Sequence, residues 1–557
     1  MQAQDGTVAT TGRWRARLRL RGGGPWSMGA VLIALVVLAP IAAVIWTALH
    51  PERNIWPHLV STTLPRYLGN SLLLMAAVGT ITGVAGSGCA WLVTRYRFPG
   101  ARALEYLLLL PLAIPAYIGA YALVDFLEYA GPVQTGLRHL FGWSSARDYA
   151  FPEIRSRGAA ILVLSAALYP YVYLLARAAF REQSGGGEEV AMSLGLGPWR
   201  RFVRVGLPMA RPAIAAGVAI VMMETVNDYG TVSYFAVQTL TTGIFSVWLQ
   251  SYNAGGAAQI ACVILGLVVA LVLLEKTSRR RLRYYALSNR HRPVLKRRLS
   301  GWRGGLACLA CTLPFALGFV LPGAVILSHA LGRQGGWADP GLLRALVHTL
   351  TVCGLAAVVT VAAALFLVYG VRLSGARLPR LLMPVTTIGY AAPGAVLAVG
   401  ILVPLAALDH RLADGLFALT GIDPGLLLTG TGFALVLAYS VRFFAIAQGA
   451  TDSAMGRIRP SLPMAARSLG RNRGQVLREV HFPLIRGSLV SALLLVFVDG
   501  VKELPATLLL RPFNYDTLAT RVHEKASLEQ LGEAAPAALL VIAVGLCAVG
   551  WLARTHR

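Results

Sequence analysis

Long apolar runs alternate with short polar loops along the whole chain. About twelve of these runs approach 20 residues, the length that crosses roughly 30 Å of hydrocarbon. They cover residues 28–49, 70–94, 104–127, 158–180, 209–232, 258–274, 304–330, 347–370, 381–408, 430–450, 487–510 and 535–553. The runs are continuous and lack the alternation of β-barrel strands, which predicts helices. The fold class is therefore expected to be all-α, a polytopic membrane protein with about twelve transmembrane helices.

The composition agrees with a chain that lies in a lipid bilayer. Of 557 residues, 56% are hydrophobic and only 14% are charged, which is too apolar for a soluble globule. The net charge is +26, but the basic residues lie in short loops between the apolar runs, so no nucleic-acid partner is expected. The first apolar run has no small-residue cleavage motif after it and is interpreted as a retained helix.

One segment of the chain occurs twice. The two copies are residues 189–208, EVAMSLGLGPWRRFVRVGLP, and residues 464–483, MAARSLGRNRGQVLREVHFP. Gly195 and Pro208 recur as Gly470 and Pro483, and the numbers differ by 275 in both cases (470 − 195 and 483 − 208). An even number of predicted spans separates the copies, so the halves are expected to be parallel six-helix units. A pseudo-two-fold axis along the membrane normal follows, with a pathway between the halves.

This repeat divides the chain into five parts. They are a basic arm at 1–27, a first repeat at 28–275, a basic linker at 276–303, a second repeat at 304–553 and a short tail at 554–557. The repeated loops are residues 181–208 and 456–483. The positive-inside rule places the arm and the linker, both rich in arginine, in the cytoplasm, so both termini are expected to be cytoplasmic.

Both loops resemble the EAA loop of binding-protein-dependent ABC importer permeases, in which a glycine and a later proline stand at fixed spacing. The matching residues are Glu189, Ala191, Gly195, Val205, Leu207 and Pro208 in the first copy and Ala465, Ala466, Gly470, Val480, Phe482 and Pro483 in the second. The second copy departs from the family pattern at Met464, where the family usually has Glu. The resemblance implies that each loop forms a short coupling helix that docks on an ATPase subunit, with the glycine supplying a turn.

The resemblance also implies partners and a location. They are two copies of a separate ABC ATPase subunit, a periplasmic or extracellular solute-binding protein and the lipid bilayer of the bacterial cytoplasmic (inner) membrane. No lysine in this chain stands in a Gly-Lys-Ser/Thr Walker A loop, so the chain is expected to be a transport subunit and not an enzyme. No cofactor is expected on it, and ATP and Mg²⁺ are used by the partner.

A finer resemblance concerns the cargo. Residues 224–242 and 502–524 are similar to ferric-iron importer permeases, as is the fusion of two halves in one chain. Ferric iron is therefore the expected substrate. The alternatives are a permease of the same class for thiamine, phosphonate or polyamine, and a secondary transporter driven by an ion gradient, which the paired loops disfavour.

Two pairs of acidic residues lie inside the apolar runs. Glu224 and Asp228 are four residues apart, and the same numerical step of the repeat maps them onto Asp499 and Glu503. On continuous helices each pair shares one face, so four carboxylates are expected to approach the axis and line a cation path. The alternative is a structural role: they pair with Lys502 or Arg511, or cap a helix break near Pro505.

Two prolines are further candidates for the path. Pro115 and Pro393 are expected inside the third helix of each half, where proline frees a carbonyl and permits a kink. Cys308 and Cys311 form a C-x-x-C, but a second ligand pair at metal-site spacing is missing, so no metal ligand is assigned.

Overall fold

The computed structural model describes residues 25–183, 190–280, 296–332, 336–374, 377–387, 389 and 392–555. Most of the predicted arm and linker, and Glu189 of the first coupling loop, lie outside these residues. Eleven described helices are long and apolar enough to cross a membrane, and the bent pair Ala101–Ala113 and Ala116–Phe141 makes a twelfth. The predicted all-α fold with about twelve spans is confirmed.

Helices form the first half almost completely. Its elements are α1 (Pro25–Leu49), α2 (Trp56–Ser61), α3 (Leu64–Arg95), β1 (Tyr96–Arg97), α4 (Ala101–Leu107), η1 (Leu110–Ala113), α5 (Ala116–Leu127), α6 (Pro132–Phe141), α7 (Arg157–Glu182), α9 (Pro198–Arg201), η2 (Phe202–Gly206), α10 (Leu207–Asn227), α11 (Gly230–Tyr234), α12 (Leu240–Phe245), η3 (Ser246–Gln250) and α13 (Ala254–Arg280). Here η1 is a 3₁₀ turn, whereas η2 and η3 are π turns.

The second half repeats this order. Its elements are β2 (Arg297–Arg298), α14 (Trp302–Phe315), the π turn η4 (Ala316–Val320), α15 (Leu321–Leu331), α16 (Pro340–Ser374), α17 (Arg377–Val385), α19 (Gly394–Thr420), α20 (Phe433–Gly456), α21 (Ser461–Ser468), α22 (Arg473–Val476), the π turn η5 (Leu477–His481), α23 (Phe482–Lys502), α24 (Pro505–Leu510), α25 (Leu518–Ser527) and α26 (Leu531–Thr555).

The repeat is visible in local hydrogen bonding as well as in element order. The π turns η2 and η5 start at equivalent positions of the repeat (477 − 202 = 275), and both ends of α10 and α23 keep the same step (482 − 207 and 502 − 227). At residues on either side of this stretch the step is 278: Ser71 Oγ accepts the N–H of Leu240, as Thr349 Oγ1 accepts the N–H of Leu518. A pair of threonines forms the same capping box at the start of α12 and of α25.

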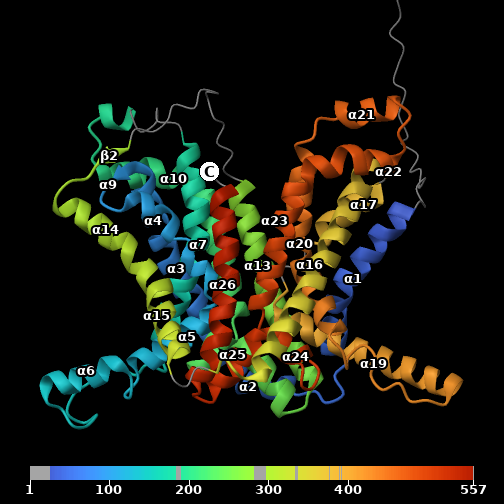
Figure 1. The fold of residues 1–557 in the computed structure, drawn as a ribbon, viewed down its shortest axis with the longest axis horizontal. Coiled ribbons are helices and arrows are strands. Elements are labelled where there is room, and N and C mark those ends of the chain that lie inside the picture. The colour runs from blue at the N-terminus through green and yellow to red at the C-terminus, as the bar shows by residue number, and fades with distance from the viewer. Residues whose placement is uncertain are drawn as a thin grey trace, which may run out of the picture.

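The first helix of each half packs against the other half. Helix α1 contacts α16, α17 and α19, whereas α14 and α15, with η4 between them, contact α3, α5 and α7. In Figure 1, α1 accordingly lies beside α16 and α17, and α14 and α15 lie beside α3 and α5. The exchange buries apolar surface that joins the halves into one body.

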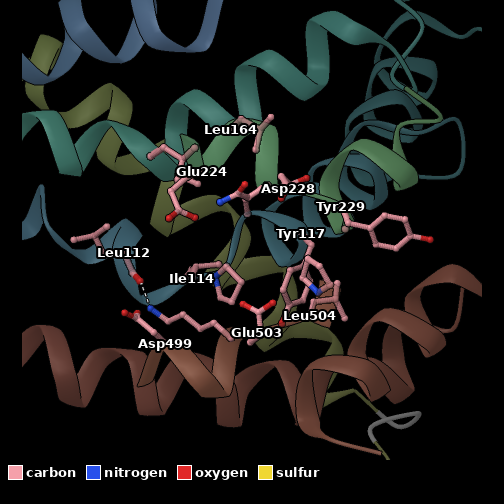
Figure 2. Close-up of a pocket in the computed structure, with 18 of the residues that line it drawn as sticks. Leu112, Ile114, Tyr117, Leu164, Glu224, Asp228, Tyr229, Asp499, Glu503 and Leu504 are labelled. Atoms are coloured by element: carbon pink, nitrogen blue, oxygen red, sulfur yellow. Dashed lines mark hydrogen bonds between the residues drawn. The ribbon is translucent and has the colours of Figure 1, made fainter. Parts of the chain in front are cut away.

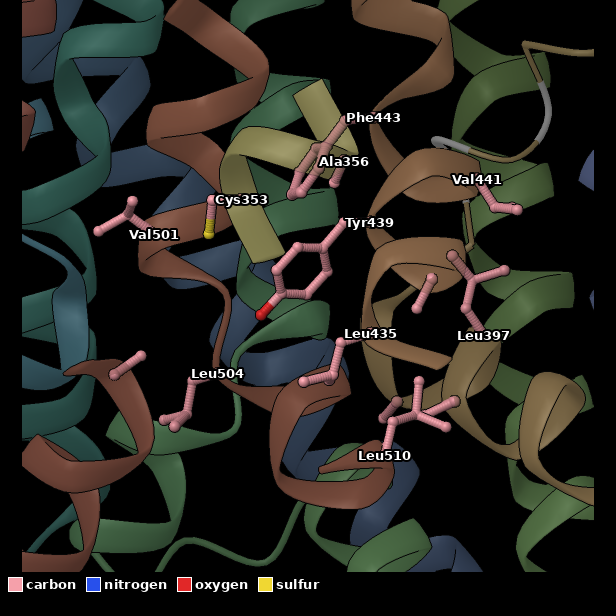
Figure 3. Close-up of a cluster of buried hydrophobic side chains, with 14 of the residues drawn as sticks. Cys353, Ala356, Leu397, Leu435, Tyr439, Val441, Phe443, Val501, Leu504 and Leu510 are labelled. Carbon is pink, nitrogen blue, oxygen red and sulfur yellow. The ribbon is translucent and has the colours of Figure 1, made fainter. Parts of the chain in front are cut away.

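A large apolar core occupies the contact between the halves. Figure 3 shows part of it, where Cys353 of α16, Tyr439 of α20 and Val501 of α23 converge. The Tyr439 hydroxyl would be costly to bury alone, but it lies 2.5 Å from Thr507 Oγ1. The core therefore fixes α24 against α20, close to the cavity described below.

The inter-repeat linker ends in a small sheet. Strands β1 and β2 pair in parallel, with Tyr96 opposite Arg297. Next to this sheet, Lys296 Nζ donates a 2.8 Å hydrogen bond to the Val93 carbonyl and lies 3.8 Å from a carboxylate oxygen of Glu105. The end of the linker is thus fastened to the first half.

Four predicted spans differ from the observed helices. The third span of each half is broken, before Pro115 in the first half and before Pro393 in the second. The predicted spans 209–232 and 487–510 run instead over Pro198–Asn227 and Gly474–Lys502. Their helices end early because the chain turns before Gly230 and before Pro505. They begin early because a π turn lets each helix continue through Pro208 or Pro483.

Candidate functional site

A cavity of about 170 Å³ lies between the two halves. The first half contributes η1, the start of α5, part of α7 and the junction of α10 with α11; the second half contributes α20 and the junction of α23 with α24. Figure 2 shows labelled carboxylate side chains from both halves around this space. The cavity is therefore placed where the sequence predicts a pathway.

All four predicted carboxylates line this cavity. Glu224 and Asp228 belong to the first half, and Asp499 and Glu503 to the second. Their convergence from equivalent positions of the two halves follows from the pseudo-two-fold arrangement. Whether they carry an ion stays a prediction.

The predicted geometry of each pair is wrong in one respect. Asp228 and Glu503 do not share a helical face with their partners, because α10 ends at Asn227 and α23 ends at Lys502. Both residues have extended backbone, with ψ of 132° and 115°. The helix breaks carry these two carboxylates beyond the helix ends.

Each of these two carboxylates caps the helix that follows the break. Asp228 Oδ1 accepts the N–H groups of Thr231 and Val232 at 3.0 and 3.1 Å. Glu503 Oε1 accepts the N–H of Ala506 at 3.1 Å. Capping satisfies donors that the start of a helix leaves unpaired. The structural alternative, a cap at the break near Pro505, is confirmed for Glu503.

Two cationic side chains share the cavity with the carboxylates. Arg442 of α20 forms an ion pair with Glu503, with 3.1 Å between Nε and Oε2, and the two side chains are 11% and 5% exposed. Lys502 Nζ donates a 2.5 Å hydrogen bond to the carbonyl of Leu112 in η1. The predicted pairing with Arg511 is not observed, since Arg511 forms ion pairs with Asp516 and Glu524.

The cavity breaks the symmetry of the repeat. The step between equivalent positions maps Lys502 onto Asn227 and Arg442 onto Ala167, and all four of these residues line the cavity. The carboxylates are thus duplicated, whereas both cations belong to the second half. With every acidic and basic group of the lining charged, the formal charge is −2 (two cations against four carboxylates).

Both predicted path prolines begin a helix instead of kinking one. Pro115 caps α5 and Pro393 caps α19, each with extended backbone. Pro115 lines the cavity. Pro393 does not line it, but Gly394 after it packs so closely that a Cβ there would overlap Glu503 and Arg442. A side chain at this position would displace that ion pair, and a role of the prolines in gating stays a prediction.

The two predicted coupling loops share one backbone conformation. Gly195 and Gly470 have φ of +74° and +84°, which the sequence predicts from their place at a turn. In the first copy Leu196 N–H donates to the carbonyl of Ala191, and in the second Arg471 N–H donates to that of Ala466. In each copy the glycine N–H also donates to the carbonyl three residues earlier. These two hydrogen bonds together form a Schellman motif, which ends a helical turn.

The loops expose apolar side chains. Leu194 and Leu469, at equivalent positions of the repeat, are 73% and 82% exposed, and Trp199 is 73% exposed. In Figure 1, α9 and α21 lie at the end of the molecule where the C-terminus is marked, opposite α2, α24 and α25. The predicted coupling helix of the second copy is α21, which includes Ala465 and Ala466. Exposed apolar side chains of this kind are typical of a surface that binds another protein.

The shared spacing from glycine to proline serves the helix that follows. Val205 lies in the π turn η2 and Val480 in η5, directly before α10 and α23, whose first residues are Leu207 and Phe482. Pro208 and Pro483 are the second residues of these helices. A proline ring clashes with the carbonyl four residues earlier in a regular helix, and the wider π turn relieves that clash. Each loop is therefore continuous with a spanning helix whose far end reaches the cavity.

Sequence reasoning missed Arg442 as a cavity residue. The signal was present, because a lone arginine inside the apolar run 430–450 is costly in a membrane and marks a partner or a polar pathway. The bond from Lys502 to Leu112 had no such signal, since it depends on how the two halves meet.

Comparison with known proteins identifies the family. The description "Binding-protein-dependent transport system inner membrane component" matches residues 82–284 and 356–555, which together exceed half of the chain. The Fe(3+)-transport system permease protein FbpB 2 of Haemophilus influenzae is 28% identical, over 85% of this chain and 87% of that protein. The ferric transport system permease protein FbpB of Actinobacillus pleuropneumoniae is 22% identical, over 89% of this chain and 73% of that protein.

A shorter relative matches about half of the chain. The sulfate transport system permease protein CysT of Escherichia coli is 26% identical, over 46% of this chain and 93% of that protein. The duplicated family match agrees with the repeated π turns and glycine turns of the structure. This chain belongs to the binding-protein-dependent transport system inner membrane components, as a permease with two family domains fused in one polypeptide.

Proposed function

We propose that this permease forms the membrane pathway for ferric iron delivered by a periplasmic or extracellular binding protein. The observation that carries the proposal is the cavity between the halves, whose lining has four carboxylates and a formal charge of −2. A buried site of negative charge lowers the energy of a cation in a medium that otherwise excludes ions. Ferric iron is a hard cation that favours oxygen ligands.

The relatives support the same cargo. The two ferric permeases named above match both halves of this chain, whereas the sulfate permease matches about half of it. Sulfate is a divalent anion, and a lining with more carboxylates than cations repels it. Both the length of the match and the charge of the cavity favour the cation.

ATP hydrolysis is assigned to a separate subunit. Two copies of an ABC ATPase would dock on the two glycine-turned loops, whose exposed Leu194 and Leu469 offer equivalent contacts. The proposal therefore has α9, α21 and both chain termini on the cytoplasmic side of the inner membrane. The continuity of the loops with α10 and α23 gives closure of the ATPase a direct route to the cavity.

The test is uptake of Fe³⁺ into proteoliposomes that hold the complete complex, with loaded binding protein outside and ATP inside. E224Q/D499N keeps side-chain size but removes one negative charge from each half, and uptake per folded complex should fall at least about tenfold. D414N, an exposed acid of α19 outside the cavity, is the matched control and should transport normally. Unchanged uptake in the double variant, or sulfate uptake by the wild type, would contradict the proposal.

A further inference from the structure

One hydrogen bond crosses the cavity from half to half. Lys502 is the last residue of α23 in the second half, and its ammonium donates to the carbonyl of Leu112 in η1 of the first half at 2.5 Å. Figure 2 shows the bond as a dashed line beside Asp499. Asp499 is one helical turn earlier on α23, which keeps a carboxylate beside the ammonium.

The break before α5 explains why the Leu112 carbonyl is available. In a continuous helix it would accept the N–H of Ala116, four residues later. The chain turns at Ile114 and Pro115, whose ψ angles are 117° and 143°, and α5 starts afresh at Ala116. The break leaves a buried acceptor that must find another donor. Lys502 supplies it from the other half.

The first half has an asparagine where the second half has this ammonium. The equivalent of Lys502 in the repeat is Asn227, which also ends its helix and lines the cavity. Its Oδ1 atom is buried without a hydrogen-bond partner among the described residues. At this place in the fold the second half thus has a charged hydrogen bond to the first half, which we call the Lys502–Leu112 strap. The first half has an unsatisfied oxygen there.

We propose that Lys502 is a displaceable internal cation that occupies the empty pathway and yields to the cargo. The inference rests on the proposed function, because it requires a cationic cargo. With the cavity empty, the ammonium offsets part of the negative charge and fastens α23 to η1. An entering metal cation takes over that charge compensation, and the ammonium leaves the Leu112 carbonyl.

Two physical properties suit lysine to this role. Its charge sits on a flexible four-carbon stem, so the ammonium can move while α23 stays in place. Among the described residues its bond is to a neutral carbonyl and not to a carboxylate at ion-pair distance, which makes the contact easier to release than the pair of Arg442 with Glu503. Binding of cargo and separation of the halves are then linked, and each favours the other.

The first experiment measures cation binding to the full chain purified in detergent. The probe is Tb³⁺, whose luminescence is excited through nearby tyrosines, and Tyr117, Tyr171 and Tyr229 line the cavity. K502M removes a positive charge next to the ion and should lower the Kd for Tb³⁺ at least about tenfold. K502R keeps the charge and should stay within about threefold of the wild type. K502Q provides a second neutral variant if K502M does not fold.

The matched control is K525M. Lys525 forms an ion pair with Glu533 and lies outside the cavity, so its loss should leave Tb³⁺ affinity unchanged. The Tb³⁺ luminescence that K502M gives must also vanish when E224Q and D499N are added to it, because those carboxylates hold the ion. A Kd in K502M and K502Q equal to or weaker than that of the wild type overturns the proposal.

The second experiment separates this inference from the identity of the cargo. In the complete complex without binding protein, K502M should raise ATP hydrolysis at least about threefold, because the halves are no longer fastened, whereas K502R and K525M should not. If the wild type fails to take up Fe³⁺ but K502M both binds Tb³⁺ more tightly and raises hydrolysis, ferric iron is the wrong cargo and the role of Lys502 stands for another cation. If the wild type takes up Fe³⁺ but K502M changes neither hydrolysis nor Tb³⁺ affinity, the strap alone is refuted.

Discussion

Replacing Arg442 by methionine should destabilise the second half of the permease. Glu503 would keep its buried carboxylate but lose the guanidinium that lies 3.1 Å away, and its side chain is only 5% exposed. Removing one partner of a buried ion pair costs about 3–5 kcal/mol, because the other charge remains desolvated and uncompensated. Methionine fills much of the same volume, so little of this loss comes from a cavity.

The cost can be converted into a shift of the unfolding temperature. The unfolding entropy of proteins is about 2.1 cal/mol/K per residue, or about 1.2 kcal/mol/K for the 557 residues of this chain. A loss of about 4 kcal/mol therefore lowers the unfolding midpoint by about 3 °C. A shift of this size is measurable by tryptophan fluorescence of the purified protein in detergent.

The double variant R442M/E503Q supplies the decisive comparison. It removes both charges, so it should recover most of the stability that R442M loses, with a coupling energy of at least about 2 kcal/mol. Glutamine keeps an oxygen that can accept the N–H of Ala506 at the start of α24. Two results would show that the ion pair does not hold the junction of α23 with α24. One is an unfolding midpoint of R442M equal to that of the wild type. The other is a stability loss in the double variant equal to the sum of the losses in R442M and E503Q.

Three other predictions concern the loops and the outer surface. G195A should reduce stimulation of ATP hydrolysis by loaded binding protein several-fold, because φ of +74° costs a side chain about 1 kcal/mol, whereas G449A, inside α20 with open space around it, should not. The N–H of Gly341 holds the pKa of Asp339 below its usual range. The stability that this carboxylate contributes is therefore fully present above about pH 4, and the difference in unfolding midpoint between the wild type and D339N should shrink as the pH falls below that value and through the lowered pKa. A cysteine at Trp199 should be labelled by an impermeant maleimide only from the cytoplasmic side.

Each of these has a result that would contradict it. Wild-type stimulation in G195A would show that the glycine turn is not needed for coupling. A stability difference for D339N that does not shrink at all as the pH falls below about 4 would mean that the carboxylate acts through its shape and not its charge. Labelling of the Trp199 position from outside would reverse the proposed orientation.

The sequence predicted the architecture and the gathering of the carboxylates because both follow from local patterns. Apolar length predicts spans, and the constant step of the repeat places Glu224 and Asp499 at equivalent points on either side of the axis. The helix breaks were harder to predict, because Gly230 and Pro505 lie inside runs whose hydrophobicity continues through them. Hydrophobicity reports what is buried, and it says little about where a buried backbone turns.

The contacts between the halves could not be predicted from either half alone. The bond from Lys502 to Leu112 joins residues 390 positions apart, and it depends on a carbonyl that is free only because α5 starts anew. Arg442 carries a readable signal of its own, a charge in an apolar run, but its partner is fixed by the packing of α20 against α24.

The exposed leucines of the two loops have a consequence for the life of the protein in the cell. Leu194 and Leu469 stand on short, glycine-terminated turns at one end of the molecule, with most of their surface open to water. A newly made permease without its motor subunits would present two such apolar tips to the cytosol, where chaperones and proteases recognise exposed apolar segments. Assembly would hide both tips at once. The same residues that we expect to transmit motion would thus also mark a permease that has no ATPase subunits. Degradation of that unassembled permease would match its amount to the amount of the ATPase.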